Sequence, residues 1–135
     1  MRRDEGKTVL VAEDDDIDAI AIEKAIELYS NNIKIIRAID GEDTLNRLAS
    51  ATPDLVLMDI KMPRMDGREA LVKIKSDITL MRMPVVMMST SDDESDINYC
   101  YQNNCNAYVV KPIGFDMSTA VVKSILDFWL KTAVH

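Results

Sequence analysis

A chain of 135 residues with 47% hydrophobic side chains can form one compact domain with a real core, so disorder is not expected. Its formal charge of −7 argues against a nucleic-acid partner, which needs a basic footprint, and favours a basic protein surface or a cation. The only histidine is the last residue, His135, so histidine-based catalysis and histidine-ligated metals are close to excluded.

No apolar run approaches the ~20 residues that a membrane-spanning helix needs. Residues 1–7 are charged and lack the apolar middle of a signal peptide. We therefore expect a cytoplasmic protein that contacts neither membrane nor nucleic acid. Cys100 and Cys105 fall in one segment without a nearby histidine, which predicts buried, reduced thiols rather than a disulfide scaffold or a zinc site.

Five short apolar segments alternate with longer amphipathic segments along the chain. The expected strands cover residues 8–12, 33–39, 54–59, 85–88 and 107–110, and the expected helices cover residues 16–29, 42–49, 68–75, 92–104 and 115–131. Nearly continuous apolar strands are typical of a parallel sheet that right-handed crossover helices cover on both faces. The pattern predicts a doubly wound α/β fold, one domain over residues 1–135 with its core at 7–131, and no output domain.

The first expected strand ends in four consecutive carboxylates, residues 13–16. Crowded carboxylates repel one another unless a cation compensates them, and magnesium accepts carboxylate oxygens together with retained waters. We therefore assign Glu13 and Asp14 to a metal site. A structural alternative remains for Asp15, Asp16 and Asp18, because aspartate caps helix N-termini and suits a first turn.

Three further strand ends carry reactive side chains, namely Asp59, Ser89 and Lys111. In an open parallel sheet, ligands bind beyond the carboxyl ends of the strands, so these residues should meet the acid pair. Asp59 could attack phosphorus, Lys111 could place a positive charge on a phosphoryl oxygen, and Ser89 could donate a hydrogen bond. The plainer alternatives are a surface lysine for Lys111 and a turn or helix cap for Ser89.

Four motifs in this order resemble the receiver domain of bacterial two-component response regulators. They are Glu13-Asp14 after the first strand, LVLMDIKMPRMDG around Asp59, PVVMMST with Ser89, and AYVVKP with Lys111. The resemblance extends over residues 7–130. Asp18, the stretch STSDDESDI and the FWL near the end are similar to small stand-alone receivers that serve phytochrome-like or hybrid sensor kinases.

The resemblance implies a flavodoxin-like (βα)5 fold with strand order 2-1-3-4-5. It also implies that Asp59 accepts a phosphoryl group from a sensor histidine kinase. Glu13, Asp14 and Asp59 would then bind Mg²⁺, Asp14 more directly than Glu13, with the backbone carbonyl of Lys61 as a further ligand. Such a protein would be a signalling protein that catalyses its own phosphorylation and later loses the phosphate to water.

The resemblance further implies a conformational switch. Ser89 stands where threonine is commoner, and Tyr108 matches an aromatic residue that turns inward on activation. The switch would bias the surface formed by the last two helices and the strand between them. The bond between Lys111 and Pro112 would be cis, a conformer confined almost entirely to X-Pro bonds.

The last expected helix carries more apolar residues than one buried face needs. Val122, Ile125 and Trp129 form an inward stripe, whereas Val121, Phe128 and Leu126 lie elsewhere around the axis. Such a surplus favours a homodimer surface, for which the candidates are Val121, Phe128 and Trp129. Scattered surface hydrophobic residues are the alternative.

Two rival functions share parts of this pattern. A metal-dependent phosphohydrolase with an aspartyl-phosphate intermediate usually carries a second aspartate two residues after the nucleophile, but Lys61 occupies that position here. A substrate-covering cap domain is also missing from the pattern. A pseudo-receiver that binds partners without phosphorylation is disfavoured by the intact set of acidic residues, serine and lysine.

Overall fold

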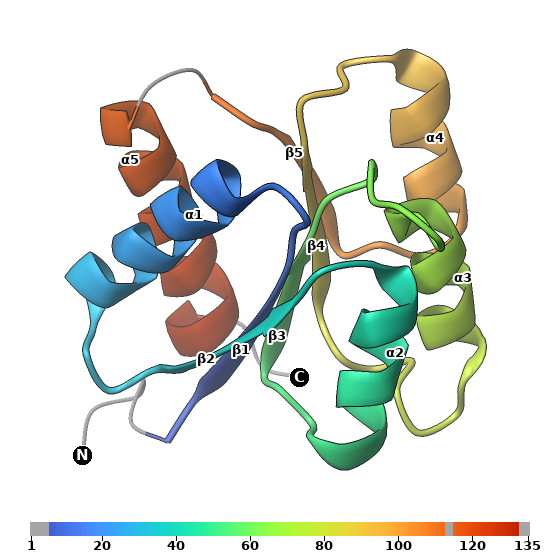
Figure 1. Cartoon of the computed structure of the whole chain (residues 1–135), viewed down its shortest axis with the longest axis horizontal. Helices are drawn as coiled ribbons and strands as arrows, with labels where there is room; N and C mark the ends of the chain where they lie inside the picture. The colour runs from blue at the N-terminus through green and yellow to red at the C-terminus, as the bar shows by residue number, and fades with distance from the viewer. Residues whose placement is uncertain (1–5, 113–114, 133–135) are drawn as a thin grey trace.

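The computed structural model describes residues 6–112 and 115–132, and Figure 1 shows a central sheet between two layers of helices. The strands are β1 (Thr8–Ala12), β2 (Lys34–Ala38), β3 (Leu55–Met58), β4 (Val85–Ser89) and β5 (Ala107–Val110). All neighbouring strands pair in parallel, in the order β2-β1-β3-β4-β5. The predicted fold class and strand order are confirmed.

Each strand is followed by a helix. The helices are α1 (Asp16–Tyr29), α2 (Gly41–Ser50), α3 (Gly67–Ser76), α4 (Glu94–Gln102) and α5 (Phe115–Leu126). Helices α1 and α5 cover one face of the sheet, and α2, α3 and α4 cover the other (Figure 1). Within the described residues, no helix is long and apolar enough to cross a membrane.

The core consists of two hydrophobic clusters, one on each face of the sheet. Alternate residues of one strand enter different clusters: Leu55 and Leu57 face α1 and α5, whereas Val56 and Met58 face the other helices. The central strands β1, β3 and β4 are therefore apolar at almost every position, while the edge strands β2 and β5 are only partly buried.

Aspartates begin the first four helices. The carboxylates of Asp15, Asp40, Asp66 and Asp93 each accept a hydrogen bond from a backbone N–H of the first helical turn, 2.6 to 3.0 Å away. The capping role considered for Asp15 is thus confirmed. Asp40 is the cap of α2, and Gly41 is its first residue, one residue before the expected start at 42.

The C-terminal helix differs from its prediction in two ways. Helix α5 ends at Leu126 and continues as a π-helical segment, η1 (Asp127–Thr132). This segment contacts the end of α1, because the Tyr29 hydroxyl donates to Asp127 Oδ1 at 2.8 Å. Leu126, expected away from the core, is fully buried, whereas Val122 and Ile125 face the core as predicted.

The expected cis bond between Lys111 and Pro112 is not observed. No peptide bond among residues 6–112 and 115–132 is cis, so this prediction is wrong for the structure described. The preference of an X-Pro bond for trans is only about 0.5–1 kcal/mol, which leaves the choice to the tertiary surroundings rather than to the sequence.

Candidate functional site

The loops that follow β1, β3, β4 and β5 leave the sheet at one edge, at the top of Figure 1. Backbone hydrogen bonds continue past the strand ends and fix the residues that come next. Asp59 N donates to Ala12 O at 3.0 Å, and Lys111 N donates to Ser89 O at 2.7 Å. Residues far apart in sequence are thereby brought to one rim of the sheet.

The ammonium group of Lys111 lies among three carboxylates. It donates to Oε1 of Glu13, to Oδ2 of Asp18 at 3.0 Å and to Oδ2 of Asp59 at 3.0 Å. Only 9% of its side chain is exposed, which is incompatible with the alternative of an ordinary surface lysine. Burial by itself lowers the pKa of Lys111, but the hydrogen bond to Glu13 and the charges of Asp59 and Glu13 raise that pKa above its usual value.

Glu13 is almost completely buried beside this lysine. Burial raises the pKa of Glu13 to about 7; the charge of Asp59 adds to the rise, and the hydrogen bond from Lys111 opposes it. The local environment thus disfavours the full set of negative charges. A bound cation would remove that penalty.

Oxygens of Glu13, Asp14 and Asp59 lie within 4.8 Å of one another. Asp14 is exposed, whereas Glu13 and Asp59 are buried, so a cation held here would keep one open side toward solvent. An all-oxygen donor set with room for water is what magnesium accepts, so the residues present fit this ion. The carbonyl of Lys61 as a further ligand stays a prediction.

Asp59 is held through both of its carboxylate oxygens. Oδ1 accepts a hydrogen bond from the N–H of Ile60 at 2.7 Å, and Oδ2 accepts from Lys111. The next helix starts directly against it, because Gly67 N donates to Ile60 O at 2.8 Å. A Cβ atom at Gly67 would collide with the carbonyl of Asp59, so only glycine allows α3 to begin this close to the site.

Arg37, on the edge strand β2, was not predicted to belong to the site. Its Nε and Nη2 donate to the carbonyl of Glu13 at 3.2 and 3.0 Å, and Nη2 also reaches the carbonyl of Asp14 at 3.3 Å. Its Nη1 pairs with Asp16 at 2.8 Å. One guanidinium therefore clamps the backbone that carries the acid pair. The sequence signal for this role is weak: a charged residue near the end of a mostly apolar strand that also contains Lys34.

The sequence places Asp18 in the first turn of α1 and among the residues similar to the stand-alone receivers, and the structure adds a contact with Lys111. Its backbone N–H is capped by Asp15, while its side chain leaves the helix and reaches Lys111. The side chain is 45% exposed, so it covers the solvent side of the otherwise buried ammonium. Sequence spacing gave no indication of this contact because Lys111 lies on a distant strand.

Ser89 and Tyr108 share a hydrogen-bond network at the ends of β4 and β5. Ser89 is buried, and its Oγ accepts from the N–H of Ser91 at 3.2 Å. The Tyr108 hydroxyl donates to the carbonyl of Ser91 at 2.7 Å. Burial raises the pKa of Tyr108, against hydrogen bonds with Ser89 and Ser91. The two predicted switch residues are thus linked through one loop residue.

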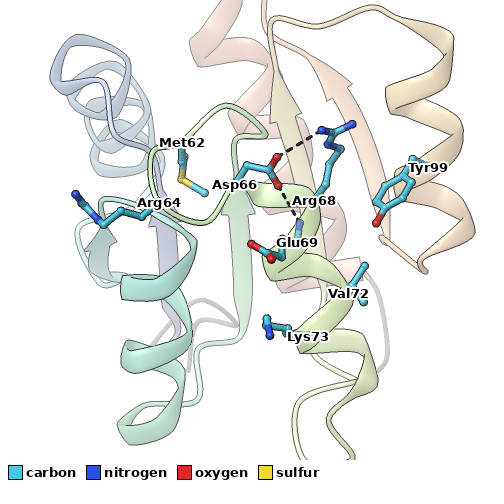
Figure 2. Close-up of a pocket in the computed structure, with 8 residues that line it drawn as sticks. All are labelled: Met62, Arg64, Asp66, Arg68, Glu69, Val72, Lys73 and Tyr99. Atoms are coloured by element: carbon cyan, nitrogen blue, oxygen red, sulfur yellow. Dashed lines mark hydrogen bonds and ion pairs between the residues drawn. The ribbon is translucent and has the colours of Figure 1, made fainter.

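A separate groove of about 740 Å³ lies along α3 and the loop before it, with Tyr99 of α4 also lining it, outside the acid cluster. Figure 2 shows Asp66 at its edge, between the guanidinium of Arg68 and the backbone N–H of Glu69. Arg68 also pairs with Asp96 at 3.1 Å and lies 5.7 Å from the ring centroid of Tyr99. These contacts join α3 to α4.

The three candidate dimer residues differ in exposure. Phe128 is 50% exposed, whereas Val121 and Trp129 are partly buried and pack against the core between the sheet and α1/α5. Phe128 and Trp129 contact edge to face, with ring centroids 4.9 Å apart. Homodimerisation through this surface stays a prediction.

Most of the chain matches a known protein family. Residues 9–123 match the family model described as the response regulator receiver domain. Response regulator Rcp1 of Synechocystis is 31% identical, over 93% of this chain and 90% of that protein. The solved Mn²⁺-bound form of Rcp1 has a TM-score of 0.88, with 30% identity over 95% of this chain and 97% of that chain.

Two further solved structures are similar over nearly the whole chain. The phosphorylated cyanobacterial phytochrome response regulator RcpA has a TM-score of 0.91 and 36% identity, covering 95% of this chain and 96% of that chain. Response regulator RPA3017, from red light signalling of R. palustris, has a TM-score of 0.86 and 32% identity, covering 95% and 96%.

Proposed function

Because this chain belongs to the response regulator receiver family, we propose that it accepts, in the cytoplasm, a phosphoryl group on Asp59 from the phosphohistidine of a sensor histidine kinase. The observation that carries the proposal is the position of Asp59 itself. It shares a metal-sized space with Glu13 and Asp14 on one side and is bound to Lys111 on the other.

The contacts of Asp59 suggest how it would react. One carboxylate oxygen attacks phosphorus, an oxygen–phosphorus bond forms, and the bond from phosphorus to the donor nitrogen breaks. Lys111, already aimed at Asp59, would place its positive charge on a phosphoryl oxygen. Mg²⁺ held by Glu13, Asp14 and Asp59 would supply charge neutralisation for the phosphoryl group. The only histidine in the sequence is His135, and we propose that a partner kinase supplies the donor histidine.

The network at Ser89 suggests how phosphorylation would be passed on. The Ser89 hydroxyl would turn toward the phosphoryl group and give up its hydrogen bond with the N–H of Ser91. Ser91 also holds Tyr108, so a shift of this loop would release or re-orient the tyrosine. The result would be a population shift of the surface formed by α4, β5 and α5, with the fold unchanged.

Incubation with acetyl phosphate and Mg²⁺, followed by intact mass measurement, tests the proposal. The expected result is one phosphoryl group on the wild type and none on Asp59→Asn. Absence of an adduct under these conditions would favour a pseudo-receiver. Rapid multiple turnover of phosphomonoesters would favour the phosphohydrolase instead.

The similarity to RcpA and Rcp1 supports a narrower proposal about the partner. RcpA is named as a phytochrome response regulator, and we propose a phytochrome-type sensor kinase as the phosphoryl donor for this chain. A purified, autophosphorylated kinase of that type should transfer its label to this protein faster than kinases of other types do. Equal or slower transfer than from those kinases would contradict the narrower proposal without touching the role of Asp59.

A further inference from the structure

We propose that Asp18 withholds Lys111 from the incoming phosphoryl group and thereby slows phosphorylation of Asp59. The inference rests on the function proposed above. It concerns one carboxylate on the first turn of α1, whose Oδ2 lies 3.0 Å from Lys111 Nζ.

An ammonium group can donate only three hydrogen bonds. Lys111 has three N–H bonds, and all three already have carboxylate acceptors, in Glu13, Asp18 and Asp59. A phosphoryl oxygen can receive a hydrogen bond from Lys111 only if one of these acceptors gives way.

Asp18 is the acceptor that is most easily displaced. Glu13 is buried and is tied to the N–H of Asp15 as well, and Asp59 is the phosphoacceptor. Asp18, by contrast, is half exposed and lies on the solvent side of Lys111, where water can solvate it once it moves. The phosphoryl group therefore competes with Asp18 for the same ammonium group.

Charge acts in the same direction as the competition for hydrogen bonds. Asp18 adds a fourth carboxylate to a site where Glu13, Asp14 and Asp59 already lie close together. An anionic phosphodonor approaching this site is repelled by Asp18, and Asp18 is not among the three carboxylates whose oxygens lie within 4.8 Å of one another. Removing its charge should therefore accelerate phosphorylation without removing a metal ligand.

The experiment compares rates of phosphorylation by acetyl phosphate at saturating Mg²⁺, followed by intact mass. In this reaction the Asp59 oxygen–phosphorus bond forms and acetate leaves. We expect Asp18→Asn to react about three- to tenfold faster than the wild type, as suits one partly exposed charge. Asp18→Glu, which restores a carboxylate at this position, should return the rate toward that of the wild type.

A matched control separates the local effect from a change in overall charge. Glu27 is exposed near the other end of α1, and Glu27→Gln makes the same charge change far from Lys111. Its rate should stay within about twofold of the wild type, because exposed charges further apart than a Debye length are screened.

A second measurement does not depend on phosphoryl transfer. In the metal-free protein, acetylation of Lys111 by an amine-reactive ester, mapped by peptide mass spectrometry, should increase several-fold in Asp18→Ala, because the side chain covering the ammonium group is gone. A general loss of fold would instead raise the labelling of all lysines together, and circular dichroism would show it.

The outcomes discriminate between the two proposals. If the wild type is phosphorylated but Asp18→Asn is no faster, or Glu27→Gln is faster by the same factor, the role of Asp18 is overturned while the receiver function stands. Unchanged labelling of Lys111 in Asp18→Ala would also overturn it. If the wild type takes up no phosphoryl group at all, both proposals fail together.

Discussion

Two lysines lie at opposite ends of the parallel strands, here called the carboxyl edge and the amino edge of the sheet. Each lysine donates to three oxygen acceptors, but the acceptors differ in charge. At the carboxyl edge, Lys111 contacts three carboxylates. At the amino edge, Lys75 at the end of α3 donates to the carbonyls of Met81 and Met83 at 3.1 and 2.9 Å and to Oδ1 of Asn106 at 2.8 Å. The number of hydrogen bonds is the same, and the electrostatic setting is opposite.

The pKa values of the two lysines follow this difference. Burial lowers the pKa of Lys75, and its neutral acceptors do not compensate the lost solvation. The carboxylates around Lys111 more than compensate its burial and raise its pKa. Lys75 thus joins the loops before β4 and β5 without bringing negatively charged groups close to one another. Lys111 sits in a set of charges that a metal ion and a phosphoryl group would rearrange, which is a property expected of a functional site.

The largest expected effect comes from removing each lysine in turn. Lys111→Met should slow phosphorylation of Asp59 by about 10²–10³-fold, because a preorganised positive charge on a phosphoryl oxygen is lost. Lys75→Met should leave that rate near the wild-type value. It should instead lower the free energy of unfolding by about 0.5–1.5 kcal/mol, because three oxygen acceptors lose their donor and only the carbonyl of Met83 is partly buried. Phosphorylation followed by intact mass and urea denaturation measure the two effects; equal loss of rate in both variants would remove the distinction.

Arg37 supports the carboxyl edge through the backbone carbonyls of Glu13 and Asp14, without contacting Asp59 or Lys111. Arg37→Ala should weaken Mg²⁺ binding by about 10–100-fold, as expected when a group that orients metal ligands is lost. Arg47→Ala is the matched control, because Arg47 makes only an exposed helical pair with Asp43 at 3.2 Å. Isothermal titration calorimetry with Mg²⁺ measures both. Unchanged affinity in Arg37→Ala would show that the backbone holds the acid pair unaided.

The acidic edge should also respond to pH and metal together. The pKa of Glu13 is raised from 4.5 to about 7 in the folded, metal-free protein, so between these values the folded state holds a proton that the unfolded chain lacks. This contribution makes unfolding easier as pH rises through that window. Mg²⁺ requires the deprotonated carboxylate, so its stabilising effect should grow over the same range.

Thermal unfolding with and without Mg²⁺, from about pH 5 to about pH 8, checks this prediction. The Mg²⁺-induced rise in Tm should be small at the acidic end and largest at the basic end. In Glu13→Gln the pH dependence of the metal-free protein should flatten. A Mg²⁺ effect that is independent of pH would show that Glu13 is ionised throughout.

The sequence alone describes the elements of this fold better than it describes the long-range side-chain contacts. The bounds of β1, α1 and β5 agree with the prediction residue for residue, because apolar runs and helical spacing are local signals. The gathering of strand ends at one rim follows from the parallel order. By contrast, the contacts of Arg37 and Asp18 depend on which long side chain reaches across from a distant element, and no local pattern encodes that.

The same limit applies to the amino edge and to the C-terminus. Nothing in the spacing of Lys75 and Asn106 predicts that they meet, since they follow different strands and carry no motif. The apolar spacing predicts one helix over residues 115–131, because it does not distinguish an α-helix from the π-helical segment that follows Leu126. Its contact between Tyr29 and Asp127 becomes visible only once α1 and α5 lie together on one face.

The smallest expected effect tests whether acceptor charge alone distinguishes the two lysines. In the structure, Oδ1 of Asn106 accepts hydrogen bonds from Lys75 at 2.8 Å and from the N–H of Val85 at 2.9 Å. Asn106→Asp keeps an oxygen acceptor for both donors and adds a negative charge. The free energy of unfolding should rise by about 0.5–1 kcal/mol at neutral pH, the usual size of a partly exposed ion pair. Because Lys75 would depress the pKa of the new carboxyl group, the gain should vanish as pH falls below about 4. Urea denaturation at neutral pH and below about pH 4 measures this gain in stability. The phosphorylation rate of Asp59 should not change, because the new charge lies at the amino edge of the sheet, away from Asp59.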